Sequence, residues 1–332
     1  MPALKPTPKI LTTLLVRVCL SILLVWYLYC LLVPAGKGAV TRDVSFPAGS
    51  GIRKLAADLK SGGIIRSTWH FVLVSRLRGQ AQRLKAGDYR FNDGMSTAEI
   101  LRKVAAGEVD FRRFALPEGY SIYQAAELLE QQGIFKKDVF LEKCRDSALL
   151  ARLGVPGSSV EGYLFPATYN LSLNGTEEQL ISQMVAHFNK MAGSLDLTGR
   201  SGLTLHKLVT LASLIEKEAV SPEEKPLISS VFHNRLRLGM PLQSDPTSVY
   251  GVRAFAGKVT KKDIGRQSEY NTYLNRGLPP GPIGNPGADA LQAALQPADT
   301  PYLYFVARQN GTHQFSRTLE EHNRAVNHYL RR

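Results

Sequence analysis

The sequence predicts an α+β protein: a single N-terminal transmembrane helix, then a small βααβ module, then a mixed α+β domain. Three observations predict this organisation. There is one long apolar run near the N-terminus, a pattern of about twenty residues that occurs twice, and a C-terminal part in which helices alternate with long Gly- and Pro-rich loops. We expect five segments: a tail at 1–10, a transmembrane helix at 11–33, the module at 40–110, a second related α/β module at 111–200 packed into the functional domain, and the core of that domain at 201–332.

The apolar run extends from Leu11 to Val33, and Arg17 is its only charged residue. About 20 such residues cross a hydrocarbon core of roughly 30 Å. With Lys5, Lys9 and Arg17 on the N-terminal side, the positive-inside rule places the N-terminus in the cytoplasm. A cleavable signal peptide is disfavoured, because its apolar region is usually about 7–15 residues long. We therefore expect a single-pass protein of the inner (cytoplasmic) membrane whose body is periplasmic or otherwise extracytoplasmic.

Charge and cysteine content narrow the class of protein. The formal net charge of +13 would attract anionic polymers or membrane surfaces, but no nucleic-acid motif with interleaved aromatic residues accompanies it. Nucleic acid is therefore not an expected partner. Cys19 and Cys30 lie in the apolar run, so Cys144 is the only cysteine of the exported part and cannot form an internal disulfide there. We expect Cys144 to be buried in a helix.

The repeated pattern is FPAGSGIRKLAADLKSGGII (46–65) and LPEGYSIYQAAELLEQQGIF (116–135), in which seven of twenty positions are identical. Each copy predicts a turn, an amphipathic helix and a glycine stop. A second helix and a Gly-Tyr strand are expected after each copy, the strands being AGDYRF (86–91) and EGYLFP (161–166). Ser96 and Glu99 predict a capping box for the next helix.

The C-terminal part predicts a helix over 204–219 and a second one running to Gly239 that begins with a capping box of Ser221 and Glu224. A hairpin around residues 308–311 and a final helix capped by Thr318 follow.

Motifs for phosphate binding, dinucleotide binding, zinc hydrolysis and serine nucleophile elbows are missing, so we expect no cofactor and no metal. Carboxylates, amides and aromatic residues instead concentrate between 213 and 287, a composition that suits sugars. On a helical wheel with Leu208 at 0°, Glu216 falls at about 80° and Glu218 at about 280°, on opposite edges of the apolar stripe, while Lys217 at about 180° faces solvent. The helix dipole and apolar neighbours raise the pKa expected for Glu218, which suits a proton donor to a glycosidic bond. The wheel alone does not decide between the two glutamates.

Four segments together resemble the endolytic murein transglycosylase (YceG-like) family: LASLIEKEA, SVFHNRLRLGMPLQSDPTSVYG, YNTYLNRGLPPGPIGNPG and TPYLYFVA. The resemblance covers essentially the whole chain and implies that the 40–110 module is LysM-like and that 201–332 is catalytic. It assigns the acid/base role to the second glutamate of Glu-Lys-Glu, which is Glu218 here. It also implies cleavage, without water, of the β-1,4 bond between N-acetylmuramic acid and N-acetylglucosamine within nascent glycan strands. The products would carry 1,6-anhydromuramoyl ends, and strand elongation would stop. The expected partners are peptidoglycan glycan strands, the membrane through one helix, and peptidoglycan synthases.

Six residues of the matching segments are candidates for substrate binding: Asn234, Gln243, Asp245, Tyr270, Asn271 and Tyr273. Asp245 could instead build a turn, and Asn234 could be a structural amide. Where the family has a Phe/Trp-Pro-Asp-Thr motif, this chain has Phe165-Pro166-Ala167-Thr168, so the aspartate is missing. Two other functions remain open. One is a non-catalytic, membrane-anchored peptidoglycan-binding protein, and the other is a muramidase-type hydrolase with Asp245 as its second carboxylate.

Overall fold

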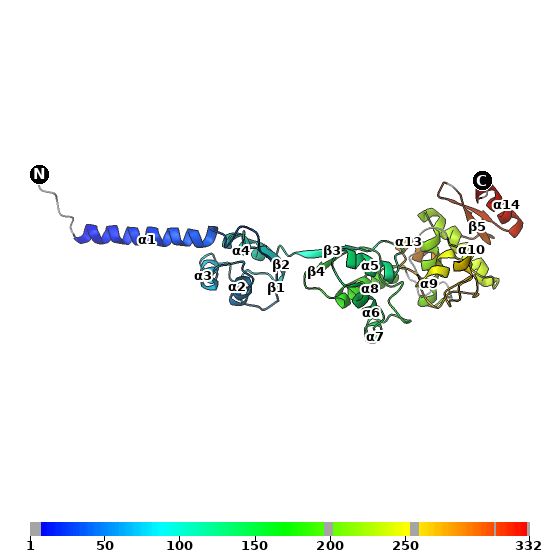
Figure 1. Ribbon diagram of the computed structural model, residues 1–332, viewed down its shortest axis with the longest axis horizontal. Coiled ribbons are helices and arrows are strands. Elements are labelled where there is room, and N and C mark those ends of the chain that lie inside the picture. The colour runs from blue at the N-terminus through cyan, green and yellow to red at the C-terminus, as the bar shows by residue number, and fades with distance from the viewer. Residues whose placement is uncertain (1–7, 196–201, 253–258, 309, 331–332) are drawn as a thin grey trace. The chain divides into compact units, whose positions relative to one another are not determined.

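The first described element is the long helix α1 (Pro8–Leu32) (Figure 1). The computed structural model describes residues 8–195, 202–252, 259–308 and 310–330. The segment Thr12–Leu32 of α1 has a mean hydropathy of 2.2, and its side chains have little cover from the protein. Because uncovered apolar side chains are unfavourable in water, α1 is compatible with a single-pass membrane anchor. Its orientation stays a prediction, and most of the expected tail at 1–10 lies outside the described residues.

The chain divides into two compact units. Unit 1 consists of the residues up to 112 together with 170–175, and unit 2 consists of 113–169 and 176–332. The division passes through strands β3 (Phe111–Ala115) and β4 (Thr168–Ser172), which pair with each other. The finer boundaries expected from the sequence stay predictions, and residues 196–200 of the expected second module lie outside the described part of the chain.

Unit 1 is built on the antiparallel strands β1 (Thr41–Phe46) and β2 (Gly87–Asn92), in which Thr41 lies opposite Asn92. Alternate side chains point inward, so that Val44 and Tyr89 are among the buried core residues. Three helices complete the unit: α2 (Ile52–Ser61), α3 (Thr68–Leu77) and α4 (Thr97–Ala106) (Figure 1). The β-α-α-β order predicted for 40–110 is present, and the capping box at the start of α4 forms. The likeness of this unit to a LysM module stays a prediction.

The repeated sequence pattern gives the same local structure twice. One copy contains α2 and the other contains α5 (Ile122–Gln131), and each helix follows a strand. The paired glycines Gly49 and Gly119 have φ of +80° and +73° before the helices, and Gly63 and Gly133 have φ of +76° and +64° after them. Non-glycine residues rarely adopt this conformation, which explains why the glycines recur at these positions.

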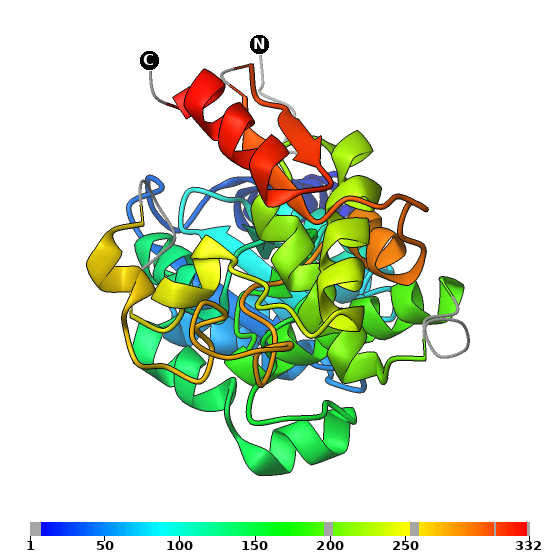
Figure 2. The same cartoon turned by 90° about the vertical axis from the view of Figure 1, so that its right-hand side faces the viewer.

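Unit 2 contains most of the remaining helices and the hairpin of β5 (Tyr304–Ala307) and β6 (His313–Ser316). The terminal helix α14 (Leu319–Leu330) packs on this hairpin, as Figure 2 shows. The hairpin and the helix capped by Thr318 were both predicted. The other helices are α6 (Lys137–Lys143), α7 (Ser147–Leu153), α8 (Glu177–Ser194), α9 (Leu205–Glu218), α10 (Lys225–Arg237), α11 (Asp245–Val249), α12 (Lys261–Ile264) and α13 (Ala288–Leu295). Cys144 caps the C-terminal end of α6 and is buried, as expected.

Helix α9 is the central helix of unit 2. It packs against α13, α10 and α11, and its residues from Leu208 to Ile215 are all buried. The prediction that Lys217 faces solvent is wrong, because the first turn of α5 covers that side and Lys217 Nζ donates to Gln124 Oε1 at 3.3 Å. Beyond its first turn, where Lys207 is exposed, α9 is covered by protein up to its C-terminal turn. The last turn of α9 is therefore where polar side chains gather.

Two local predictions are wrong. Residues 161–166 form turns, not a strand, because Gly162 has φ +85° and Leu164 N donates to the side chain of Asn285 instead of to a neighbouring strand. The capping box at Ser221 is also missing. A short 3-10 turn, Pro222–Glu224, precedes α10, and Glu224 accepts hydrogen bonds from the backbone N and Nδ1 of His313 on β6.

Candidate active site

Glu218, the last residue of α9, is a partly buried carboxyl group that receives a hydrogen bond from Ser244 Oγ to its Oε1 at 2.6 Å. Burial raises the pKa of Glu218 to about 7, and the nearby charge of Asp245 adds to this. The bond from Ser244 and the charge of Arg235 act in the opposite direction, because they stabilise the carboxylate. A carboxyl group with a pKa near neutrality can both donate and accept a proton, which is the property that an acid/base catalyst needs.

The loop that carries Ser244 is held in an unusual conformation. Gln243 has φ +52°, the only positive value of a non-glycine residue in the described part of the chain. Its backbone N donates to Thr272 O, and Ser244 N donates to Thr272 Oγ1 at 3.0 Å. Strained backbone persists where surrounding contacts enforce it, and such positions cluster at functional sites. The segment around Thr272 therefore fixes the hydroxyl that contacts Glu218.

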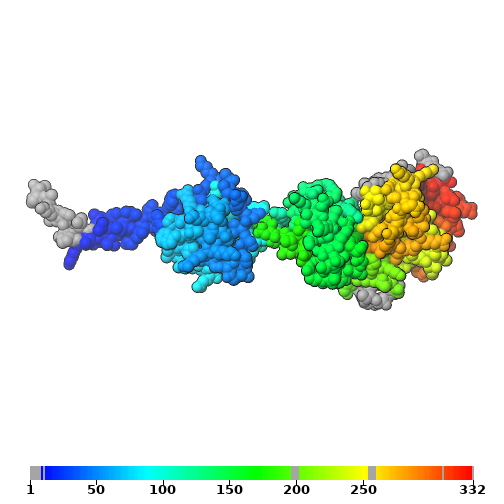
Figure 3. All heavy atoms as spheres, turned by 60° about the horizontal axis from the view of Figure 1, so that its bottom comes forward, coloured from blue at the N-terminus to red at the C-terminus, as the bar shows by residue number. Residues whose placement is uncertain are grey.

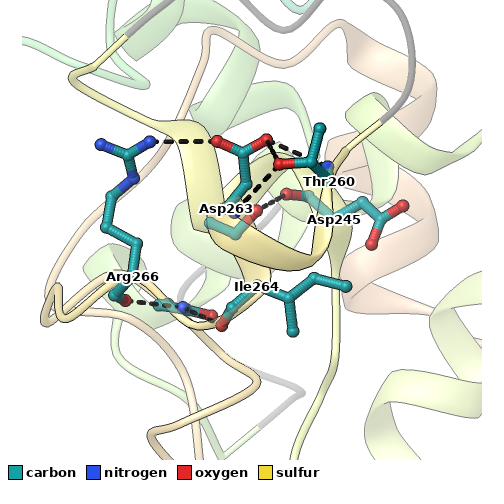
Figure 4. A network of polar contacts seen from close by, with 7 residues as sticks. Asp245, Thr260, Asp263, Ile264 and Arg266 are labelled. Atoms are coloured by element: carbon teal, nitrogen blue, oxygen red, sulfur yellow. Dashed lines mark hydrogen bonds and ion pairs between the residues drawn. The ribbon is translucent and has the colours of Figure 1, made fainter.

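Asp245 follows directly and begins α11. Its Oδ1 accepts a hydrogen bond from Tyr273 Oη at 2.6 Å. Burial and the bond to Asp245 raise the pKa of Tyr273, so the phenol keeps its proton. Asp245 lies beside the turn in which the Asp263 carboxylate binds Thr260 and Arg266, and its own carboxylate points away from that network (Figure 4).

Arg235 on α10 connects the site to the hairpin. It is buried, and its Nε donates to Leu303 O at 2.7 Å while its Nη1 donates to Leu242 O at 2.9 Å. A weaker bond of 3.4 Å reaches Gln243 Oε1. Arg235 thus holds the residues just before Ser244 and supplies the positive charge that lowers the pKa of Glu218. Sequence reasoning selected its neighbour Asn234 and missed Arg235, although both belong to the same His-Asn-Arg motif.

Glu216 is part of a different network from Glu218, as their opposite positions on the wheel predicted. Its carboxylate pairs with Lys225 Nζ at 3.0 Å and accepts a bond from Gly287 N at 2.9 Å. Both partners of this ion pair are almost completely buried. Glu216 is therefore a structural residue that joins α9 to α10.

A second buried carboxyl group, that of Glu161, was not predicted. Burial raises its pKa to about 7, and it accepts hydrogen bonds from Tyr250 Oη at 2.8 Å and from Asn285 Nδ2 at 3.2 Å. The ring of Tyr250 lies 4.7 Å from that of Tyr270, one of the candidate substrate-binding residues. Glu161 thus orients the Tyr250 ring. The sequence predicts a strand at 161–166, and a strand there gives no reason to expect a buried carboxyl group at Glu161.

A pocket of about 440 Å³ lies next to this tyrosine pair, on the side of α9 that carries Lys217. Figure 3 shows the green early part of unit 2 packed against its yellow and orange part, the two segments that supply the pocket walls. Its lining combines aromatic and apolar side chains with amides and charges. The residues are Tyr120, Ser121, Tyr123, Gln124, Glu127, Leu128, Gln131, Lys137, Lys217, Pro246, Val249, Tyr250, Gly251, Val252 and Ile283.

Comparisons with known proteins identify the family of this chain. A sequence model described as the YceG-like family matches residues 44–328. The endolytic murein transglycosylase of Bacillus subtilis (strain 168) is 35% identical over 318 residues, which cover 90% of this chain and 88% of that protein. The chain belongs to the YceG-like family. The endolytic murein transglycosylase of Streptococcus pneumoniae serotype 2 is 33% identical over 85% of this chain and 57% of its own length. A crystal structure of a YceG-like protein from Listeria monocytogenes has a TM-score of 0.59 and 35% identity, and covers 86% of this chain and 99% of that one.

Two candidate residues of this YceG-like chain use their amides within the protein. Asn234 Nδ2 donates to Thr300 O at 2.7 Å, and its Oδ1 accepts a bond from Arg237. Asn271 Nδ2 donates to Ile264 O at 2.8 Å, and its Oδ1 accepts a bond from the backbone N of Tyr273. Both side chains hold loops that border the site. Their roles as substrate ligands, like those of the other candidates, stay predictions.

Ala167 stands where the family motif has an aspartate, and its backbone is still hydrogen-bonded in this YceG-like chain. Ala167 O accepts a hydrogen bond from Leu116 N at 3.0 Å, next to the paired strands β3 and β4.

We expect the pH dependence of kcat/KM of this YceG-like chain to follow the protonation of Glu218. If protonated Glu218 is the acid, kcat/KM should fall above about pH 7, where this carboxyl group loses its proton. Asp245→Asn removes a charge that raises the pKa of Glu218 and should move this alkaline limb to lower pH. Ser244→Ala removes a bond that lowers the pKa and should move the limb to higher pH. Profiles of kcat/KM against pH test this, and shifts of both variants in one direction would contradict the assignment.

Proposed function

We propose that this chain is a lytic transglycosylase that cleaves the β-1,4 bond between N-acetylmuramic acid and N-acetylglucosamine inside peptidoglycan glycan strands. The single observation that carries the proposal is the partly buried Glu218 carboxyl at the end of α9, which Ser244 Oγ contacts at 2.6 Å and whose pKa burial raises to about 7. Membership of the YceG-like family and relatives named endolytic murein transglycosylase support the substrate class.

One carboxyl group suffices for the reaction. Glu218 donates its proton to the glycosidic oxygen of the leaving N-acetylglucosamine as the bond to the muramoyl C1 breaks. The acetamido oxygen of the muramoyl residue stabilises the electron-poor C1. The Glu218 carboxylate then takes the proton from the C6 hydroxyl while O6 bonds to C1, which closes the 1,6-anhydro ring. The proton returns to Glu218, and no water is consumed.

The alternative reaction is hydrolysis with Asp245 as the second carboxylate. It needs a carboxylate that is free to activate water or to attack C1. Tyr273 Oη already donates to Asp245 at 2.6 Å, and this favours a role for Asp245 in tuning Glu218 rather than in attack. A purely glycan-binding protein would have no need of a carboxyl group with a pKa near 7 beside a strained loop.

The products of the reaction test the proposal. The full chain in detergent is incubated with purified sacculi or nascent glycan in H₂¹⁸O, and the soluble fragments are measured by mass spectrometry. We expect anhydromuramoyl ends without ¹⁸O, from the unchanged chain and, more slowly, from Asp245→Asn. Reducing ends that carry ¹⁸O would identify a hydrolase. The absence of any fragment would favour the non-catalytic alternative.

The cellular setting is part of the proposal. With α1 in the inner membrane and the N-terminus in the cytoplasm, the body would meet glycan strands as they emerge at the outer face of that membrane. Cleavage there would end strand elongation, and peptidoglycan synthases are the partners that this position favours.

The pocket beside Lys217 is proposed to hold part of the glycan. Its tyrosine rings offer apolar faces for pyranose rings, and its amides and Lys217 offer hydrogen bonds to acetamido and carboxylate groups. Tyr123 forms one wall, where its ring lies 5.8 Å from that of Tyr250 and its hydroxyl accepts a bond from Arg145. The pocket adjoins the residues that follow Asp245.

Tyr123→Ala should therefore raise KM for long glycan by about tenfold and change kcat little. A contact remote from the broken bond stabilises the substrate complex and the transition state equally. Tyr123→Phe keeps the ring and should stay near the unchanged chain. Steady-state kinetics on strands of defined length make the comparison. Equal KM values for all three proteins would place the glycan elsewhere.

A further inference from the structure

The C-terminal end of α1 is packed into unit 1. Leu31 belongs to the buried core of that unit, and Tyr27 and Cys30 pack against it. The apolar segment Thr12–Leu32 has 21 residues, which at 1.5 Å each span about 31 Å, the thickness of one hydrocarbon core. There is no spare length, so the turns that unit 1 covers also lie at the edge of the membrane.

Helices α3 and α4 are the parts of unit 1 that pack against α1, and α3 brings aromatic side chains to these turns. The ring of Trp69 lies 5.8 Å from that of Trp26, and His70 lies 5.0 Å from Trp26. Arg66, just before α3, donates to Tyr29 Oη, and its guanidinium lies 5.7 Å from the Tyr29 ring. Trp, Tyr and Arg are the residues that favour the boundary between hydrocarbon and water.

The outer face of α3 carries large apolar side chains beside the exposed Arg76. Trp69, Leu73 and Leu77 are spaced by four residues and share one face of the helix, while Phe71 and Val74 on the opposite face are buried. Trp69 is 62% exposed and Leu77 is 65% exposed, and Leu73 between them is partly buried. A surface helix normally carries polar residues on that side. This apolar ridge (Trp69, Leu73, Leu77) starts at Trp26 of the membrane helix.

Positive charge borders the ridge. Arg76, Arg78, Arg83 and Lys85 are exposed, and the segment 76–85 contains no acidic residue. Basic residues at a membrane surface are attracted to anionic lipid head groups. The position of this segment beside the ridge and the anchor favours contact with lipid.

We propose that unit 1 lies on the membrane surface, with the ridge Trp69–Leu73–Leu77 in the interfacial layer and residues 76–85 on anionic lipid head groups. The inference rests on the proposed insertion of α1. It makes the membrane a binding partner of the folded unit as well as of the anchor. Any glycan-binding surface of unit 1 must then lie away from α3.

The sequence contains only two tryptophans, Trp26 and Trp69, and this makes the proposal measurable. Trp26→Phe leaves Trp69 as the only tryptophan of the full chain, which is reconstituted in vesicles containing phosphatidylglycerol. Lipids brominated near the head-group end of the acyl chain should quench Trp69 fluorescence, and aqueous acrylamide should quench it weakly. Trp69→Phe leaves Trp26 as the only tryptophan, and quenching of its fluorescence by the brominated lipids measures insertion of the anchor. Quenching of Trp26 without quenching of Trp69 would overturn the surface contact alone, whereas quenching of neither would overturn the anchor and, with it, the contact.

A second comparison tests the length of the ridge. In the Trp26→Phe background, Leu77→Asp places a charge at the far end of α3 and should reduce quenching of Trp69 by about half. Leu319→Asp, at a similarly exposed leucine (56%) in unit 2, should not change it. Uncharged vesicles should weaken quenching of Trp69 but not of Trp26. If Leu77→Asp and uncharged lipid both leave Trp69 unchanged, Trp69 is in lipid only because it neighbours Trp26, and the proposed surface is wrong.

Discussion

Glu218→Gln is expected to lower kcat/KM for glycan cleavage by at least about 10³-fold. General acid–base catalysis contributes roughly 10²- to 10⁴-fold, and in the proposed mechanism Glu218 supplies both the acid and the base. Gln keeps the size of the side chain, and its amide can still accept a hydrogen bond from Ser244, but it cannot donate a proton to a leaving oxygen. The rate of release of anhydromuramoyl fragments from purified glycan measures the loss.

The control for this prediction is Asp245→Asn, which changes the neighbouring carboxylate in the same way. If Asp245 only tunes Glu218, this variant should retain much of the activity below pH 7, because its main effect is to lower the pKa of Glu218. Thermal unfolding of both variants checks that the fold is intact. A Glu218→Gln protein that is folded and retains more than about a tenth of the activity would remove Glu218 from the mechanism.

The sequence predicted the helix that carries the site better than the surroundings of its carboxyl group. Helical periodicity placed Glu216 and Glu218 on opposite sides of α9, and the structure puts them in separate networks. The partner of Glu218, however, is Ser244, which is 26 residues away along the chain. It is brought there by a loop with a positive φ at Gln243. Periodicity carries no information about such a loop.

The same limit explains the errors in the fold. The two copies of the repeated pattern were predictable because their helices and glycine turns depend on local sequence. The segment 161–166 looks like a strand, since apolar residues and a glycine follow one another. Its backbone N at Leu164 instead donates a hydrogen bond to the side chain of Asn285, which is more than 100 residues later in the chain. Lys217 was misplaced for a related reason, because only tertiary packing brings Gln124 over it.

Lys225→Met is expected to have the largest effect on stability. The side chains of Lys225 and Glu216 are 5% and 8% exposed, and they form an ion pair at 3.0 Å. Removing one partner of a buried pair leaves an uncompensated charge and typically costs about 3–5 kcal/mol. For a unit the size of unit 2, this corresponds to a fall of roughly 6–20 °C in Tm. Thermal unfolding of the full chain in detergent measures it.

Two matched variants decide the cause of that loss. Lys225→Met combined with Glu216→Gln removes both charges and should recover much of the stability, since the remaining amide can still accept the bond from Gly287 N. Lys137→Met breaks the exposed pair with Glu127 and should leave Tm unchanged. If the double variant were no more stable than Lys225→Met, lost packing of the lysine would explain the effect. A recovery would instead show that breaking the pair of Lys225 and Glu216 causes the loss, so that this buried pair stabilises the helix that ends at Glu218.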